Sequence, residues 1–157
     1  MSDDALRRAC YTVRFLFADR AELRRSYYNK FGRFALIGAN EYTTQIPEFS
    51  DLSPSWNQRA RGFGATIQRP VSLGAEENAL CWRNVDKWHE QDIVMHEFAH
   101  GLHLLGAFYA IPGYHRRLQS LYNTARSSGK WANTYSLSTE MEYLVSSIYH
   151  LIQGWRT

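Results

Sequence analysis

The segment of about residues 90–105 constrains the fold of this chain more than any other. Apolar side chains recur there at the spacing of one helix face, and histidines recur at the same spacing on another face. The pattern predicts a long helix that packs against a core and displays imidazoles on its other side. The apolar set is Val94, Phe98, Leu102 and Leu105, and the histidine set is His96, His100 and His103.

Two of these histidines, His96 and His100, lie four residues apart and enclose Glu97. On a helix this spacing directs both imidazoles to one side, where both can reach one tetrahedral ion at about 2 Å. Glu97 can then turn toward the open coordination position and take a proton from water. The alternative is a helix with two hydrogen-bonded histidines and no metal. We favour the metal, because burying these three side chains without an ion would be costly.

A catalytic zinc ion usually has three protein ligands and a water molecule, so a third ligand is expected. The familiar position six residues after the second histidine holds Gly106, which excludes that arrangement. The other common choice is a glutamate on a later helix, and Glu140 and Glu142 both stand at the start of the last predicted helix. We favour Glu142, because its neighbours are expected to be buried. Its alternative role is a capping box with Thr139.

The remaining periodicities predict a helix-rich α+β fold with a small mixed sheet. Two helical stretches, broken near Asp19, are expected between residues 3 and 30. Their repeating apolar positions, expected to face inward, are Leu6, Cys10, Val13, Phe17, Leu23 and Tyr27.

Short strands are expected at residues 34–38 and 75–82, with turns or loops at 40–54 and 59–69. Further helices are expected at residues 114–126 and 139–152. The inner face of the last helix would contain Met141, Leu144, Val145, Ile148, Leu151 and Ile152.

Composition and charge set the broad class. The chain has 157 residues, 45% apolar and 15% aromatic, so residues 1–157 are expected to form a single domain with a core. The net charge of +3 is small and the arginines occur in scattered pairs, which argues against nucleic-acid binding. The longest apolar stretch, residues 93–111, contains three histidines and a glutamate, which makes a membrane span unfavourable.

Two cysteines, Cys10 and Cys81, stand far apart and outside any metal-binding spacing. They are expected to form a bridge if the protein is extracellular, and two buried free thiols are the alternative. The acidic start of the chain lacks the pattern of a signal peptide, so a leader would have been removed from a secreted protein.

Several motifs together resemble the catalytic domain of anthrax lethal factor and its relatives. The motif His96-Glu-Phe-Ala-His100 is followed by Asn133-Thr-Tyr135 and, seven residues after that tyrosine, by Glu142-Tyr-Leu144. The similarity continues more weakly upstream and covers about residues 59–150. The upstream motifs, which look like the segment before the metal helix in secreted members, are Arg61-Gly-Phe-Gly64 and Glu76-Glu-Asn-Ala-Leu-Cys81.

The resemblance implies a zincin-like fold and a zinc peptidase of the gluzincin kind. It implies that His96, His100 and Glu142 bind one zinc ion and that Glu97 is the catalytic base. It also implies that Tyr135 hydrogen-bonds the developing oxyanion or the leaving amine.

Ser146 departs from this family pattern. Relatives tend to have a glutamate four residues after the third ligand, so support for a metal-bound histidine must come from elsewhere in this chain. Two other tyrosines, Tyr114 and Tyr122, compete with Tyr135, although both lie on predicted helices where core packing is commoner. We expect His103 to be hydrogen-bonded near the site rather than to bind the ion.

The expected function is hydrolysis of a peptide or protein substrate by a metal-activated water. Residues 76–81 would be the strand edge that pairs with an extended substrate. A monomer is expected, extracellular with the cytoplasm as the alternative, and without a nucleic-acid or membrane partner. The alternative function is a catalytically silent zincin-fold domain that recognises a protein partner, but the intact Glu97 and Tyr135 favour the peptidase.

Overall fold

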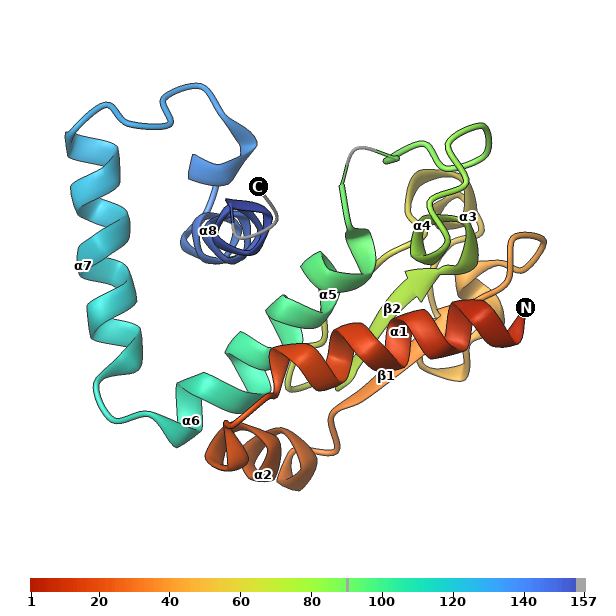
Figure 1. Ribbon diagram of the computed structural model, residues 1–157, viewed down its shortest axis with the longest axis horizontal. Coiled ribbons are helices and arrows are strands. Elements are labelled where there is room, and N and C mark those ends of the chain that lie inside the picture. Colours follow the sequence, from red (N-terminus) through yellow and green to blue (C-terminus); the bar gives the residue numbers. More distant parts are fainter. Residues whose placement is uncertain (90, 155–157) are drawn as a thin grey trace.

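A two-stranded parallel sheet lies against the helix that contains His96 and His100 in the computed structural model, which describes residues 1–89 and 91–154 (Figure 1). The strands β1 (Arg33–Ile37) and β2 (Val71–Ala75) pair from Arg33 opposite Val71 to Ile37 opposite Ala75. All five residues of β2 are buried, as in a strand covered on both faces. The α+β class is confirmed, and the strand expected at residues 34–38 is confirmed as β1.

The chain begins with the two expected helices, α1 (Asp3–Leu16) and α2 (Ala21–Asn29), separated at Asp19 by a positive φ of 53°. The predicted inner face of α1 is partly wrong, because Leu6 is 46% exposed and Cys10 is also exposed. Small side chains face inward instead and let α1 approach α4 (Glu76–Ala79) and α5 (Ile93–Gly101) closely. The buried positions of α1 are Ala5, Ala9 and Thr12.

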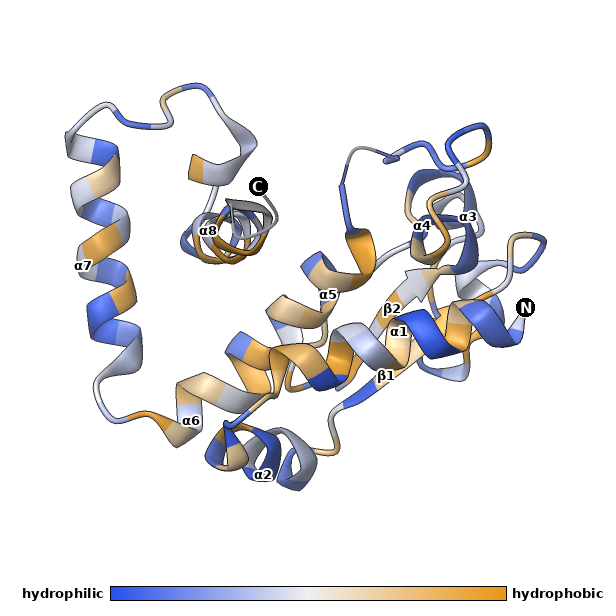
Figure 2. Ribbon diagram, viewed as in Figure 1, coloured by the Kyte–Doolittle hydropathy of each residue, from blue (hydrophilic) through white to orange (hydrophobic). Residues whose placement is uncertain are grey.

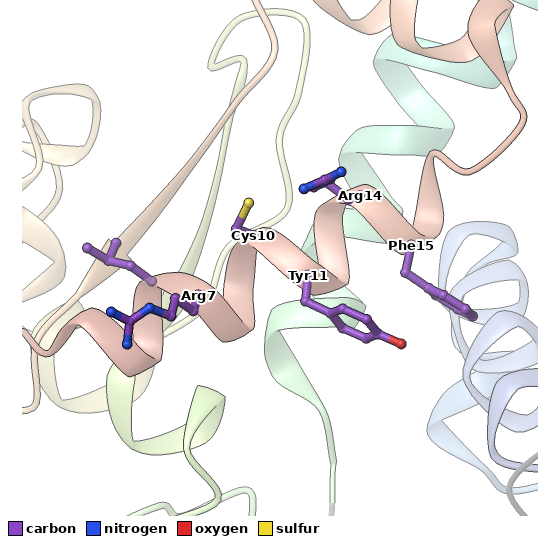
Figure 3. A pocket seen from close by; sticks show the side chains of 6 residues that line it. Arg7, Cys10, Tyr11, Arg14 and Phe15 are labelled. Carbon is purple, nitrogen blue, oxygen red and sulfur yellow. The ribbon is translucent and has the colours of Figure 1, made fainter.

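The outer face of α1 borders a surface pocket. Figure 3 shows Cys10, Tyr11 and Phe15 projecting from the helix around it. Cys81 is exposed too, and both cysteines are free, so the expected bridge is not formed.

Irregular structure connects the two strands, in agreement with the expected turns and loops. It contains the short 3-10 turns η1 (Thr43–Gln45) and η2 (Pro47–Phe49) and one helical turn, α3 (Trp56–Arg59). A single antiparallel bridge then joins Phe63 to Leu73 of β2, which makes the small sheet locally mixed.

The strand expected at residues 75–82 is wrong. β2 ends at Ala75, and the next residues form one helical turn, α4 (Glu76–Ala79). Its side chains Glu76, Glu77 and Asn78 are consecutive, polar and buried. A helical turn directs them to three different partners, whereas a strand would point alternate side chains to opposite faces.

The long helix is confirmed as α5 (Ile93–Gly101), which continues through the π-helical segment η3 (Leu102–Ala107) into α6 (Phe108–Ala110). Residue 90, where we expected it to begin, lies outside the described residues. The Asp92 side chain accepts a hydrogen bond from Met95 N–H at 2.8 Å and caps the helix. The predicted apolar face is confirmed, because Val94, Phe98, Leu102 and Leu105 are all buried.

The aromatic core gathers around Phe98, which is fully buried on α5. The rings of Phe17, Tyr27 and Phe34 lie 5.2, 5.4 and 6.0 Å from its ring centre. Figure 2 shows apolar residues on α5, the strands and α8, and many hydrophilic residues along α7. Packing behind Phe98 holds the metal-site helix against the sheet and α2.

The expected C-terminal helices are confirmed as α7 (Tyr114–Ser127) and α8 (Glu140–Gly154), with the short turn η4 (Tyr135–Leu137) between them. The predicted inner face of α8 is only partly correct. Met141 is 36% and Leu151 63% exposed, and Val145 is the one fully buried side chain described for α8. α8 lies between α7 and α5 in Figure 1 and packs against both helices. Every helix in the described part of the chain is too short or too polar to cross a bilayer.

Candidate metal centre

Three side chains from α5 and α8 converge at one point. The Nε2 atoms of His96 and His100 are 3.2 Å apart. His96 Nε2 lies 3.3 Å from Glu142 Oε2, and His100 Nε2 lies 3.3 Å from the other oxygen, Oε1. Ligands about 2.0–2.1 Å from a tetrahedral ion stand about 3.3–3.4 Å from one another. The two imidazole nitrogens have that spacing, and one ligand atom from each of the three side chains lies within 4.8 Å of the other two, so the three side chains are close enough to surround one ion.

Local sequence explains why these side chains meet. The four-residue interval places both histidines on the face of α5 opposite Phe98, whose burial sets the rotation of the helix. On α8, Val145 follows Glu142 by three residues and is 1% exposed, so the apolar contact and the carboxylate lie on one face. Within residues 1–89 and 91–154, this is the one group of histidine, cysteine, aspartate or glutamate side chains arranged to hold a metal ion.

The Glu142 carboxylate is largely enclosed and incompletely satisfied. Its side chain is 13% exposed, and Oε2 is buried without a hydrogen-bond partner among the described residues, although His96 Nε2 lies near it. A buried carboxylate oxygen without a partner is costly. A cation bound between the three side chains would remove that cost, so the residues present fit a metal ion.

The charges of the three groups are strongly coupled. Burial acts to raise the pKa of Glu142, but the adjacent His100 and His96 side chains, through polar contact and positive charge, outweigh it and lower the pKa to about 2. Burial acts to lower the pKa of His96, but the carboxylates of Glu142 and Glu97 outweigh it and raise that pKa. The site therefore favours a cation in contact with the Glu142 carboxylate.

Glu97 is partly buried next to both histidines. Burial is the largest influence and raises the pKa of Glu97, the positive histidines lower it, and the Glu142 charge raises it, with a net upward result. A carboxylate with a raised pKa beside a metal position is suited to accept and return a proton.

The segment Arg61–Gly64 packs directly on this face of α5. A Cβ added at Gly62 would lie 3.0 Å from Glu97 Cγ, and one at Gly64 would lie 2.5 Å from His100 Cβ. Such distances leave no room for a side chain, so both glycines are needed for the close approach.

The same segment pairs with β2 on its other side. Phe63 N–H donates to Leu73 O at 3.1 Å, and Phe63 O accepts from Leu73 N–H at 2.8 Å. In an antiparallel pair the neighbouring residues turn their N–H and C=O groups away from the partner strand. The backbone N–H and C=O groups of Gly62 and Gly64 have no hydrogen-bond partner in the described part of the chain.

The free strand edge beside the site is therefore formed by residues 62–64. The expectation that residues 76–81 form this edge is wrong, because α4 is helical and its four residues are buried. Ser72 connects this segment to α5, since its hydroxyl accepts a hydrogen bond from Ala65 N–H at 3.1 Å and donates one to Glu97 O at 2.8 Å.

Tyr135 lies near Glu142 and Glu97 and is 70% exposed. Partial burial, the charge of Glu142 and a hydrogen bond to it, and the charge of Glu97 all raise the Tyr135 pKa. The competing tyrosines are engaged elsewhere. Tyr122 O–H donates to Leu137 O at 2.9 Å and holds η4, and the Tyr114 hydroxyl lies 3.1 Å from His103 Nδ1.

The two candidate glutamates have different partners. Glu140 pairs with His115 at 3.2 Å, away from the site. Thr139 Oγ1 accepts a hydrogen bond from Glu142 N–H at 3.1 Å, which is half of the alternative capping box. The Glu142 carboxylate points to the histidines instead of back to the helix start. Of the two, Glu142 is the one brought to the site.

His103 is 4% exposed and hydrogen-bonds Tyr114 rather than joining the three converging side chains. Burial, followed by the positive charges of His100 and His115, lowers its pKa to about 4. In the part of the chain that the structure describes, neither Ser146 nor any other residue hydrogen-bonds Nδ1 of His96 or His100. Close packing on Gly64 supports the His100 ring instead.

Sequence reasoning missed Asn78, which caps the metal-site helix from a distant element. Its Oδ1 accepts from Ile93 N–H at 2.8 Å and Val94 N–H at 3.3 Å, and its Nδ2 donates to Asp86 and Gln91. A signal was present, since Glu76-Glu-Asn78 is a polar run enclosed by apolar residues just before the metal helix.

Comparison with models of known protein families, with curated proteins and with solved structures gives no significant match to this chain. The functional argument therefore rests on the motifs and on the geometry of the site.

Proposed function

We propose that this chain is a zinc-dependent peptidase in which His96, His100 and Glu142 bind one zinc ion. The observation that carries the proposal is the convergence of their ligand atoms: the two Nε2 atoms are 3.2 Å apart, and each lies 3.3 Å from a different carboxylate oxygen of Glu142. Two imidazole nitrogens and one carboxylate oxygen are the protein ligands of several catalytic zinc sites, which leave a position open for water or substrate. The resemblance of the motifs to the relatives of lethal factor supports the same assignment.

Glu97 is the proposed proton carrier. A bound zinc ion supplies Lewis-acid chemistry, which polarises a carbonyl oxygen and lowers the pKa of water. Glu97 takes a proton from the attacking water as its oxygen bonds to the scissile carbonyl carbon. The carboxyl group then gives that proton to the amine nitrogen as the C–N bond breaks. The raised pKa of Glu97 supports both halves of this cycle.

Tyr135 is the proposed donor to the oxyanion that develops on the carbonyl oxygen. A tyrosine hydroxyl is protonated at neutral pH, and the 70% exposure of Tyr135 lets a substrate reach it. The hydroxyl would then exchange its hydrogen bond to Glu142 for one to the oxyanion. Tyr122 supports this role indirectly by holding η4.

The proposed substrate is an extended peptide that pairs with residues 62–64. The unpaired N–H and C=O groups of Gly62 and Gly64 offer a strand edge beside Glu97 and His100. This mode of binding depends on the peptide backbone, so unfolded chains should be preferred over compact proteins.

Zinc content and cleavage of a denatured, alkylated protein test the proposal. The parent should contain one equivalent of zinc and lose cleavage on chelation. Glu97→Gln should keep zinc and lose about 10²–10⁴-fold in rate. Tyr135→Phe should lose about 10–1000-fold in kcat with little change in KM. Full activity in Glu97→Gln would overturn the mechanism, and zinc binding without cleavage would favour the silent binding domain.

A further inference from the structure

An ion pair between the partly buried Arg61 and the buried Glu77 stands directly before residues 62–64, which touch α5. Arg61 Nε bonds one oxygen of Glu77, and Nη2 donates to the other at 3.0 Å. The two side chains are 18% and 5% exposed. Such a bidentate pair fixes both the position and the plane of the guanidinium group.

The other donors of Arg61 reach the loop that follows β1. Nη1 donates to Glu41 O at 2.8 Å, and Nη2 donates to Gly38 O at 3.0 Å. Arg61 therefore joins α4, the loop after β1 and the segment that continues into Gly62. The planar guanidinium group of arginine has enough N–H donors to hydrogen-bond a carboxylate and carbonyl oxygens in different directions at once, which a lysine ammonium group cannot do with the same geometry.

α4 connects this segment to the metal-site helix through adjacent residues. Glu77 holds Arg61, and the next residue, Asn78, accepts from the N–H groups of Ile93 and Val94 at the start of α5. One helical turn thus fixes Gly62 on one side and the beginning of α5 on the other. The gap between Gly62 and Glu97 depends on this turn.

We propose that Arg61 and Glu77 are positioning residues that hold the backbone of residues 62–64 at the correct distance from Glu97 and His100. The inference rests on the proposed peptidase function, in which this backbone pairs with the substrate. Stability alone does not explain the pair, because apolar replacements of buried ion pairs are often neutral or stabilising. The contacts of Arg61 instead fix the position of residues 62–64 relative to α4 and to the loop after β1.

The test uses Arg61→Lys, Glu77→Gln and a matched control, Arg69→Lys. Arg69 also pairs with a carboxylate, because its Nη2 donates to both oxygens of Asp51 at 2.7 and 2.8 Å, but the Asp51 side chain is 69% exposed and the pair lies outside the site. With a denatured, alkylated protein as substrate, kcat/KM should fall about 10–100-fold in the first two variants, mainly through KM. Zinc content should stay at one equivalent, and Arg69→Lys should match the parent.

Amide hydrogen exchange gives a readout that needs no activity. The N–H groups of Phe63 and Leu73, which join the segment to β2, should exchange faster in Arg61→Lys and Glu77→Gln but not in Arg69→Lys. Arg61→Lys keeps the charge and carries the test if Glu77→Gln does not fold.

The outcomes distinguish failure of the positioning role of Arg61 and Glu77 from failure of the proposed peptidase function. Unchanged exchange in folded variants would overturn the positioning role, and faster exchange with unchanged KM would overturn its link to substrate binding. A zinc-loaded parent without cleavage would instead reject the peptidase, and the exchange rates alone would then decide whether Arg61 and Glu77 position residues 62–64.

Discussion

Two carboxylates on the first turn of α8, Glu140 and Glu142, provide a contrast between single residues. Glu142→Ala should weaken zinc binding by more than the roughly 10–100-fold typical of losing an outer hydrogen-bond partner of a ligand. Glu140→Ala removes only the pair with the exposed His115 and should leave zinc affinity unchanged. Zinc titration of both variants in competition with a chelator measures the difference.

The opposite result would assign Glu142 a different role. If Glu142→Ala binds zinc as tightly as the parent and loses only about 1 kcal/mol in free energy of unfolding, the residue is a helix cap.

The coupled charges of Glu142 and His96 predict a pH dependence for the metal-free protein. The pKa of Glu142 falls from 4.5 to about 2 in the folded state, so its stabilising contribution is present above about pH 4.5 and lost as pH falls toward 2. The pKa of His96 rises from 6.5, so its contribution is present below pH 6.5 and lost as pH rises through the raised value. The two contributions coexist between about pH 4.5 and 6.5.

The free energy of unfolding, compared between the metal-free parent and Glu142→Gln, checks this window. The advantage of the parent should be largest between about pH 4.5 and 6.5 and decline on both sides. A difference that stays constant from pH 2 to pH 8 would show that the carboxylate does not pair with the histidines.

At the scale of elements, the contact between residues 62–64 and α5 leaves no room for an added side chain at either glycine. Gly64→Ala would place a Cβ 2.5 Å from His100 Cβ and 2.9 Å from its Cγ, so the segment or the ring must move. We expect weaker zinc binding together with a higher KM, measured by zinc titration and steady-state cleavage.

Gly113→Ala is the control for this substitution. Gly113 has a φ of 72° and no atom within 4 Å of an added Cβ, so alanine there adds about 1–2 kcal/mol of backbone strain without a clash. Its zinc affinity should equal that of the parent. Equal zinc affinity in Gly64→Ala as well would show that the segment can yield without disturbing His100.

At the scale of the whole molecule, a metal ion would link α8 to α5, the helix packed on the sheet. α8 supplies Glu142 to the site, but Val145 is the one fully buried side chain described on it. α7 and α8 lie to one side of the sheet and its helices in Figure 1. Zinc bound between α5 and α8 should therefore stabilise the docking of α8 more than the sheet.

Hydrogen exchange before and after chelation tests this coupling. Removing zinc should accelerate exchange of the α8 amides while those of β1 and β2 change little. In Glu142→Ala the chelator should have no such effect. Equal acceleration throughout the chain would show that the ion stabilises the fold as a unit instead of docking α8.

The sequence by itself determined the elements whose pattern is local. The apolar face of α5, the His96–His100 interval and the helices near both ends follow from helical periodicity, which is visible within one segment. The strand β1 followed from a short apolar run. The candidate ligand and base residues were also predicted from the motifs, and the structure brings them together.

Tertiary structure decided the features that depend on distant partners. Residues 76–79 form a helix because Glu76, Glu77 and Asn78 meet Ser2, Arg61 and Ile93, none of them a neighbour in sequence. Close packing selected the alanine face of α1 over the face with Leu6, and it moved the free strand edge to residues 62–64. Local periodicity records which residues share a face, but only contacts across the fold determine which face is buried and which polar groups are satisfied.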